Sequence, residues 1–277
     1  VAFCFVPQGY IYAMGTVVFA YDKHSHFAIL QSTIHNQWAW KNGSTMKTDL
    51  RYTPTDVFET FPFPNNIASV KENILQEIGE IYHNTRWQLM LSLKLGLTKI
   101  YNFFHTKDLS ISEIQRTSKQ DEVICKKAFD DITKLRELHK QMDEVVLEAY
   151  GWSDIQLRHD FYEVDYLPEN DRIRYTIHPD ARKEVLKRLL ELNHTIYEEE
   201  IKQGLHKEED VAKFYEQKGI PVPAEVTAIM GVAKKEKKVK EYKSKSKKST
   251  ANESESIYKQ PGLFVEDNLF NVGDKEG

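Results

Sequence analysis

The local fold at the start of this chain is decided by the stretch Phe27-Ala-Ile-Leu-Gln-Ser-Thr-Ile-His-Asn-Gln-Trp-Ala-Trp40. Large apolar side chains recur in it every three or four residues, which is the spacing of one face of a helix. They are Phe27, Leu30, Ile34 and Trp38. Gly43 follows shortly, and glycine is common just past the end of a helix. The stretch therefore predicts a helix that ends near residue 42 and buries one face, Trp38 included.

Runs of β-branched and aromatic residues, typical of strands, precede this helix at residues 1–6, 10–14 and 16–21. After it, Pro54, Pro62 and Pro64 remove backbone donors that a helix or a central strand needs, which favours an extended connector. Residues 1–65 are thus predicted to form a small β-rich unit crossed by a helix. Because the chain opens inside a strand-like run without an initiator methionine, we expect this unit to be truncated at its start.

Residues 66–233 have the composition and periodicity of helices. Two long helices are predicted before residue 150, joined near residues 96–112, and Tyr150-Gly151 ends the second. A strand is predicted over residues 172–177. Pro179 suits the first turn of a third helix that continues to residue 204, and residues 210–217 predict a fourth. The predicted fold class is therefore α+β, with a small β-rich unit followed by a mainly α-helical domain and a disordered basic tail.

The tail spans residues 234–277. Residues 234–248 hold nine lysines against Glu236 and Glu241 and almost no apolar side chain, so burial does not repay the entropy of ordering them. Beyond this disordered tether, Gln260-Pro-Gly-Leu-Phe264 resembles the Gln-x-x-Leu-Phe peptides by which bacterial proteins dock on the replication sliding clamp. Gln260, Leu263 and Phe264 are therefore candidate partner-binding residues. Packing of the two apolar side chains on the helices of this chain is the alternative.

The composition of the 277 residues, 40% apolar and 29% charged, is that of an ordinary globular protein. No apolar run approaches the roughly 18 residues that span a bilayer, and the amino terminus lacks the pattern of a secretory signal. Cys4 and Cys125 are too few for a disulfide framework or a cysteine-based zinc site. We expect a cytoplasmic protein with no membrane partner.

Charge alone gives little support to DNA binding. Residues 234–248 contribute +7, which leaves −11 for the rest of a chain whose net charge is −4. A nucleic-acid surface needs clustered Lys and Arg to displace counterions from phosphates. Residues 1–65 come nearest, although acidic residues balance their Lys23, Lys41, Lys47 and Arg51.

The chain lacks the motifs of methyl transfer. An S-adenosylmethionine pocket needs a glycine-rich turn, and no two of the twelve glycines lie two positions apart. Methylation of an amino group also needs a Pro-Pro dipeptide beside an acidic or amide residue and an aromatic residue, and no Pro-Pro is present. We therefore expect no catalytic residue and no cofactor site in this chain.

Other catalytic patterns are equally weak. Glu-x-Lys triplets of a metal-dependent nuclease begin at Glu200, Glu216, Glu236 and Glu241, but all four fall in predicted helix or tail rather than on adjoining strands. His24-Ser25-His26 has no third metal ligand at a suitable spacing, and Ser32 with His35 has no third partner for a nucleophile and its base. No metal site is predicted.

Three segments together resemble the target-recognition region of type II restriction–modification methyltransferases of the MmeI-like and Eco57I-like group. They are residues 27–40, Leu50-Arg-Tyr-Thr-Pro54 and Phe58-Glu-Thr-Phe-Pro-Phe-Pro64. Residues 132–152 and 182–204 resemble the helical region that follows in the same polypeptides, so the resemblance covers roughly residues 1–205. In that family the amino-terminal parts hold an adenine-N6 methyltransferase with its cofactor pocket and, optionally, a nuclease.

The resemblance implies that this chain is the carboxy-terminal, DNA-reading part of a site-specific adenine-N6 methyltransferase. Its partners would be double-stranded DNA and the upstream methyltransferase domain, and S-adenosylmethionine would serve the parent enzyme and not this chain. Candidate DNA contacts follow the predicted helix on a turn-rich segment, where loops commonly carry function. They are Trp40, Lys41, Asn42, Lys47 and Arg51, with Trp40 able to stack on a base or to pack internally.

Two other classes of function fit the sequence. Long amphipathic helices and an apolar tail also suit a helical protein–protein adaptor, and a nuclease subunit with an unrecognised site is the second alternative. Salt-dependent DNA binding by residues 1–65 separates the first from DNA recognition. Magnesium-dependent cutting separates the second.

Overall fold

The computed structural model describes residues 1–6, 9, 11–12, 16–46, 49–65, 67–228 and 230. Within these ranges, residues 1–189 belong to one compact unit and residues from 190 onward to a second. No helix in these ranges is both long enough and apolar enough to cross a membrane. The tether and the candidate residues Gln260, Leu263 and Phe264 lie outside the described residues.

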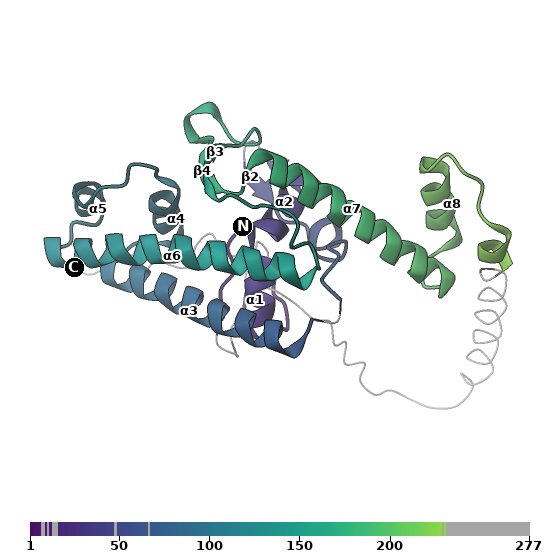
Figure 1. Cartoon of the computed structure of the whole chain (residues 1–277), viewed down its shortest axis with the longest axis horizontal. Coiled ribbons are helices and arrows are strands. Elements are labelled where there is room, and N and C mark those ends of the chain that lie inside the picture. The colour runs from purple at the N-terminus through teal and green to yellow at the C-terminus, as the bar shows by residue number, and fades with distance from the viewer. Residues whose placement is uncertain are drawn as a thin grey trace. The chain divides into compact units, whose positions relative to one another are not determined.

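The first unit combines short hairpins with long helices (Figure 1). In chain order its elements are α1 (His24–Gln31), α2 (Thr33–Asn42), β1 (Ser44–Met46), β2 (Asp49–Arg51), the π-helical turn η1 (Pro54–Phe58), α3 (Ser69–Leu93), α4 (Leu97–His105), α5 (Ile111–Ser118), α6 (Glu122–Ala149), β3 (Asp160–Glu163), the 3₁₀ turn η2 (Glu169–Asp171) and β4 (Ile173–Thr176). Helix α7 (Pro179–Lys202) begins in this unit and continues into the second, which also holds α8 (Glu208–Gln217). The α+β class is confirmed.

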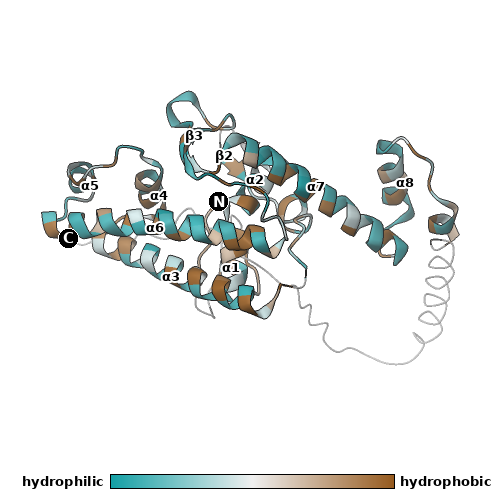
Figure 2. Ribbon diagram, in the orientation of Figure 1, coloured by the Kyte–Doolittle hydropathy of each residue, from teal (hydrophilic) through white to brown (hydrophobic). Residues whose placement is uncertain are grey.

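Helices α3 and α6 form the centre of the first unit and lie antiparallel, side by side (Figure 1). Lys71, near the start of α3, donates a hydrogen bond of 2.8 Å to the carbonyl of Glu148, near the end of α6. Figure 2 shows hydrophobic and hydrophilic residues alternating along both helices, as expected of helices with one buried face. The buried side chains include Leu75, Tyr82 and Leu89 of α3 and Ile132, Leu135 and Met142 of α6.

The ends of the long helices agree with the sequence signals. Asp121 caps α6, because its carboxylate accepts a hydrogen bond of 2.9 Å from the backbone N–H of Ile124. Gly151 follows α6 with a φ of +77°, in the left-handed region that glycine tolerates. Helix α7 begins at Pro179, as predicted. The join predicted near residues 96–112 extends from the end of α3 at Leu93 to the start of α6 at Glu122, and it contains two further helices, α4 and α5.

Two hydrophobic cores hold the first unit together. The first lies among α1, α3, α4, α5 and α6. The second joins α2 and the η1 turn to the end of α6 and the start of α7. Both cores contain residues from each side of position 65. The domain boundary at residue 65 stays a prediction from the sequence.

Two of the strands predicted in residues 1–65, at residues 1–6 and 16–21, do not form as regular strands, and most of the third, at residues 10–14, lies outside the described residues. Phe3 makes an isolated bridge, and residues 16–21 have no regular structure. The observed strands are β1 and β2, an antiparallel pair in which Ser44 lies opposite Arg51. The apolar run at residues 1–6 has a different cause, because Phe3 is buried in the first core and Phe5 packs on Phe27 and His83.

The helix predicted over residues 27–40 is two helices, α1 and α2, separated at Ser32. The Ser32 hydroxyl donates to the carbonyl of Ile29 at 2.6 Å and accepts from the N–H of His35 at 3.3 Å. A serine that caps the next helix in this way replaces the helical hydrogen bond and starts a new axis. The predicted burial of Trp38 is confirmed, and its indole N–H donates to the Thr60 hydroxyl at 3.2 Å.

The second unit is small. The end of α7 and helix α8 bury Ile201, Val211 and Tyr215 together with Val226. The helices predicted over residues 181–204 and 210–217 are thereby confirmed.

Candidate nucleic-acid interface

Helix α2 carries three of the candidate DNA contacts at its end, and its start is held by α6. The backbone N–H of Thr33, the first residue of α2, donates to the Asp143 carboxylate at 2.7 Å. The Thr33 hydroxyl lies 2.9 Å from Nε2 of His139. A carboxylate is stabilised at the start of a helix by free N–H groups and by the helix dipole. Asp143 therefore fixes where α2 begins.

Asp143 belongs to a buried polar cluster. Its Oδ2 atom lies 2.8 Å from Nε2 of His159 and 3.7 Å from Nε2 of His139. Burial by itself would raise the pKa of Asp143, but His139, His159 and Thr33 outweigh it and hold the pKa below its usual value. Burial lowers the pKa of His139. An ionised carboxylate therefore links α2, α6 and the segment before β3.

The end of α2 brings Trp40 and Lys41 to the surface. Trp40 is half-buried and stacks on Tyr166, with ring centroids 4.4 Å apart and planes 21° apart. Lys41 is exposed. Asn42 is half-buried, and its side-chain N–H donates to the carbonyl of Trp38 at 3.1 Å, so part of its hydrogen-bonding capacity serves the helix end.

The β1–β2 hairpin returns directly against the end of α2. Gly43 permits this, because a Cβ atom there would lie 2.6 Å from the Ala39 carbonyl oxygen and 2.8 Å from Cδ1 of Leu50. Arg51 is exposed on β2, and Asp49 shares its side of the strand, since alternate residues point the same way. Lys47 lies outside the described residues. The structure thus places Lys41 and Arg51 on neighbouring exposed elements.

Beneath the end of α2 and the β1–β2 hairpin, aromatic side chains pack against one another. His35 is fully buried, and its Nε2 lies 3.1 Å from the Tyr52 hydroxyl. Burial lowers the pKa of His35 to about 3, so the ring is neutral at pH 7. Phe61 contacts the same ring edge-on. Ser32 and His35 therefore serve the fold of α2, as a cap and a core side chain.

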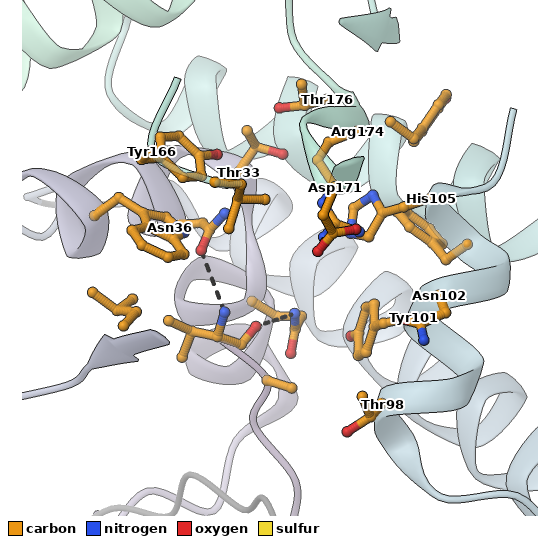
Figure 3. Close-up of a pocket in the computed structure, with 18 of the residues that line it drawn as sticks. Thr33, Asn36, Thr98, Tyr101, Asn102, His105, Tyr166, Asp171, Arg174 and Thr176 are labelled. Carbon is orange, nitrogen blue, oxygen red and sulfur yellow. Dashed lines mark hydrogen bonds and ion pairs between the residues drawn. The ribbon is translucent and has the colours of Figure 1, made fainter. Parts of the chain in front are cut away.

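A cavity of about 390 Å³ opens beside the end of α2 (Figure 3). Its walls come from α2, β2, α4 and the segment from Tyr166 to Thr176. In Figure 3 Asn36 and Tyr166 lie across the space from Tyr101 and Asn102. The volume falls within the range of about 300–1,000 Å³ typical of small-molecule sites. No sequence pattern predicts this cavity, because its walls come from segments that only the tertiary fold brings together.

One wall of the cavity is held rigidly. The Tyr101 hydroxyl accepts a hydrogen bond of 2.9 Å from the guanidinium of Arg86 and lies 3.2 Å from the Tyr82 hydroxyl. Arg86 is buried and also donates to Gln31 at 3.1 Å. The ring of Tyr101 is therefore fixed at the cavity by a buried cation.

Some of the catalytic patterns considered from sequence fall among the described residues. None of the described residues form a group of three or more His, Cys, Asp or Glu that could hold a metal ion. Of the Glu-x-Lys triplets, Glu200 lies in α7 and Glu216 in α8, and the other two lie outside the described residues.

Comparison with known families gives a match in the first part of the chain. Residues 1–65 match the family model of the MmeI target recognition domain, which confirms the resemblance found in this region. The matched region contains α1, α2 and the β1–β2 hairpin, and with them Trp40, Lys41 and Arg51. No curated protein and no solved structure matches the chain. The match indicates DNA sequence recognition in a restriction–modification system.

Proposed function

We propose that this chain recognises DNA sequence as the carboxy-terminal part of a site-specific adenine-N6 methyltransferase of a restriction–modification system. The observation that carries the proposal is the match of residues 1–65 to the MmeI target recognition domain. In this proposal an upstream domain supplies S-adenosylmethionine binding and methyl transfer, and the protein acts on DNA in the cytoplasm.

The end of α2 and the β1–β2 hairpin form the proposed DNA-contacting surface. Lys41 and Arg51 are exposed there, and Trp40 presents an aromatic ring beside them. Contacts to phosphates position a protein on DNA, whereas contacts to base edges give specificity, and arginine reads guanine through two hydrogen bonds. With Lys41, Lys47 and Arg51 as the candidate cations, the logarithm of affinity should fall against the logarithm of salt with a slope of about −3.

The proposal is tested by measuring DNA binding of the whole chain by fluorescence anisotropy at several salt concentrations. Arg51→Ala should weaken binding by about 1–3 kcal/mol if the guanidinium reads a base, or reduce the salt slope by about one if it contacts phosphate. Lys47→Ala is tested in the same way. Arg116→Ala is the matched control, since Arg116 is exposed on α5 outside the matched region. Unchanged affinity and slope in both variants would remove Arg51 and Lys47 from the interface.

Two protein partners complete the proposal. The first is the upstream methyltransferase domain, which would receive the target adenine after it is flipped out of the duplex. The second is the sliding clamp, reached by Gln260, Leu263 and Phe264 at the end of the basic tether.

A further inference from the structure

The cavity beside α2 offers aromatic faces on opposite walls. Trp40 and Tyr166 form a stacked pair on one wall, and Tyr101, held by Arg86, stands across from Tyr166 (Figure 3). Aromatic side chains of this kind stack on nucleobases of any sequence, at about 1–3 kcal/mol per base. A planar heteroaromatic ring is therefore the ligand that these walls suit.

Polar side chains with unused hydrogen-bonding capacity converge on the same space. Among the described residues, neither the Asn102 carboxamide nor the Thr98 hydroxyl has a hydrogen-bond partner, and Asn36 uses only its oxygen, toward Val1. A carboxamide presents a donor and an acceptor side by side, which is the pattern that pairs with the edge of a base. The cavity therefore combines stacking faces with groups that pair with base edges.

The charge of the lining favours a neutral ring over an anion. The ionised side chains in the lining are Asp49, Asp171 and Arg174, and Arg174 is paired with Asp171. His105 and His139 also line the cavity, and burial lowers the pKa of both, which disfavours positive charge on either ring. Among the lining side chains, a phosphate group inside would meet no cation other than the paired Arg174.

Cations lie instead next to residues of the lining. Lys41 follows Trp40 on α2 and Lys99 follows Thr98 on α4, and both lysines are exposed. These positions suit the phosphates that flank a base, while the base itself enters the neutral cavity.

We propose that this cavity binds a single nucleobase, either one unstacked from DNA at the end of α2 or one carried by a free nucleotide. If the base comes from DNA, the inference rests on the proposed function. The base is distinct from the methylation target, which the proposed function assigns to the upstream domain. Unstacking is easiest for a base that has no pairing partner, so a bulged duplex is the appropriate probe.

The test compares the affinity of the whole chain for a matched duplex and for the same duplex with one bulged nucleotide. The bulged duplex should bind at least about tenfold more tightly, because the cost of unstacking is already removed. Asn102→Ala should abolish this preference, because it removes the carboxamide that pairs with the edge of the base. Asn73→Ala, an exposed asparagine on α3 outside the cavity, is the matched control and should keep the preference.

A second arm adds free deoxynucleosides and detects contact by saturation-transfer NMR. Nucleoside binding that Asn102→Ala removes, without a preference for the bulge, identifies free nucleotides as the source. Equal binding of the two duplexes together with no nucleoside contact overturns the inference and leaves DNA recognition standing. Nucleoside contact without binding of either duplex supports the inference and contradicts the proposed function. If neither duplex binds and no nucleoside contact is detected, both the inference and the proposed function are overturned.

Discussion

Replacing Asp143 by alanine should strongly destabilise the fold and release the start of α2. The substitution leaves two groups without their partner, the Thr33 N–H at 2.7 Å and Nε2 of His159 at 2.8 Å. Each buried donor left unsatisfied costs about 1–3 kcal/mol, and removing one member of a buried charged cluster typically costs about 3–5 kcal/mol. We therefore expect the free energy of unfolding to fall by about 3–5 kcal/mol, a large part of the 5–15 kcal/mol of a typical domain.

Urea denaturation followed by circular dichroism at pH 7 measures this loss. Asp130→Ala is the matched control, because Asp130 is exposed on the same helix, and it should change stability by less than about 0.5 kcal/mol. Asp143→Asn keeps an acceptor for the Thr33 N–H and removes the charge, so its loss should be smaller than that of Asp143→Ala.

The effect of Asp143→Asn should also depend on pH. Because the folded protein holds the pKa of Asp143 below its usual value, the ionised carboxylate stabilises the fold fully above the unfolded pKa of about 4. This contribution is lost as the pH falls through the folded pKa, so the difference between wild type and Asp143→Asn should narrow below pH 4. A constant difference across that range, or equal effects of Asp143→Ala and Asp130→Ala, would refute the assigned role of the carboxylate.

Three further outcomes are expected. Burial lowers the pKa of His35 to about 3 in the folded protein, against about 6.5 in the unfolded chain. The neutral ring therefore contributes its full stability above pH 6.5. Stability is lost as the pH falls below 6.5, because the unfolded chain binds the proton more readily than the folded protein. His35→Gln should consequently lose less stability than wild type between pH 6.5 and 4.5 in thermal unfolding, and parallel losses would argue against a neutral His35. Titration calorimetry should detect no stoichiometric S-adenosylmethionine binding, and saturable binding would place a cofactor site in this chain. A peptide of residues 257–271 should bind the sliding clamp with micromolar affinity and lose it when Leu263 and Phe264 are replaced by alanine; no binding at high peptide concentration would end that proposal.

The long helices were predictable because their burial follows a single local period. The apolar positions of α3 and α6 recur every three or four residues, and the signals at Gly151 and Pro179 mark real helix ends. The strand predicted over residues 172–177 is confirmed as β4, but the strands of residues 1–65 were not predictable in the same way. Phe3 and Phe5 are apolar because they pack on helices that are distant in sequence, and a short apolar run looks the same in both settings.

The candidate site was predictable only in part. The end of α2 follows from local sequence, so Trp40, Lys41 and Arg51 could be named as candidates, and the structure places Trp40 half-buried and both cations exposed. Asp143 and the cavity depend on tertiary contacts. One signal for Asp143 was present, since it and His139 interrupt the apolar face of α6 beside Met142. Buried polar residues on an apolar face require partners, although sequence alone does not say which.

The most direct test of DNA recognition is a selection from a pool of random duplexes with the purified chain, followed by sequencing of the bound fraction. DNA recognition by residues 1–65 predicts that one short sequence becomes enriched. The enrichment should disappear in Arg51→Ala or Lys41→Ala and persist in the matched controls Arg116→Ala and Lys126→Ala, whose wild-type residues are exposed on α5 and α6. A bound fraction with the composition of the starting pool, or no bound DNA, would contradict the assignment of this chain to sequence recognition.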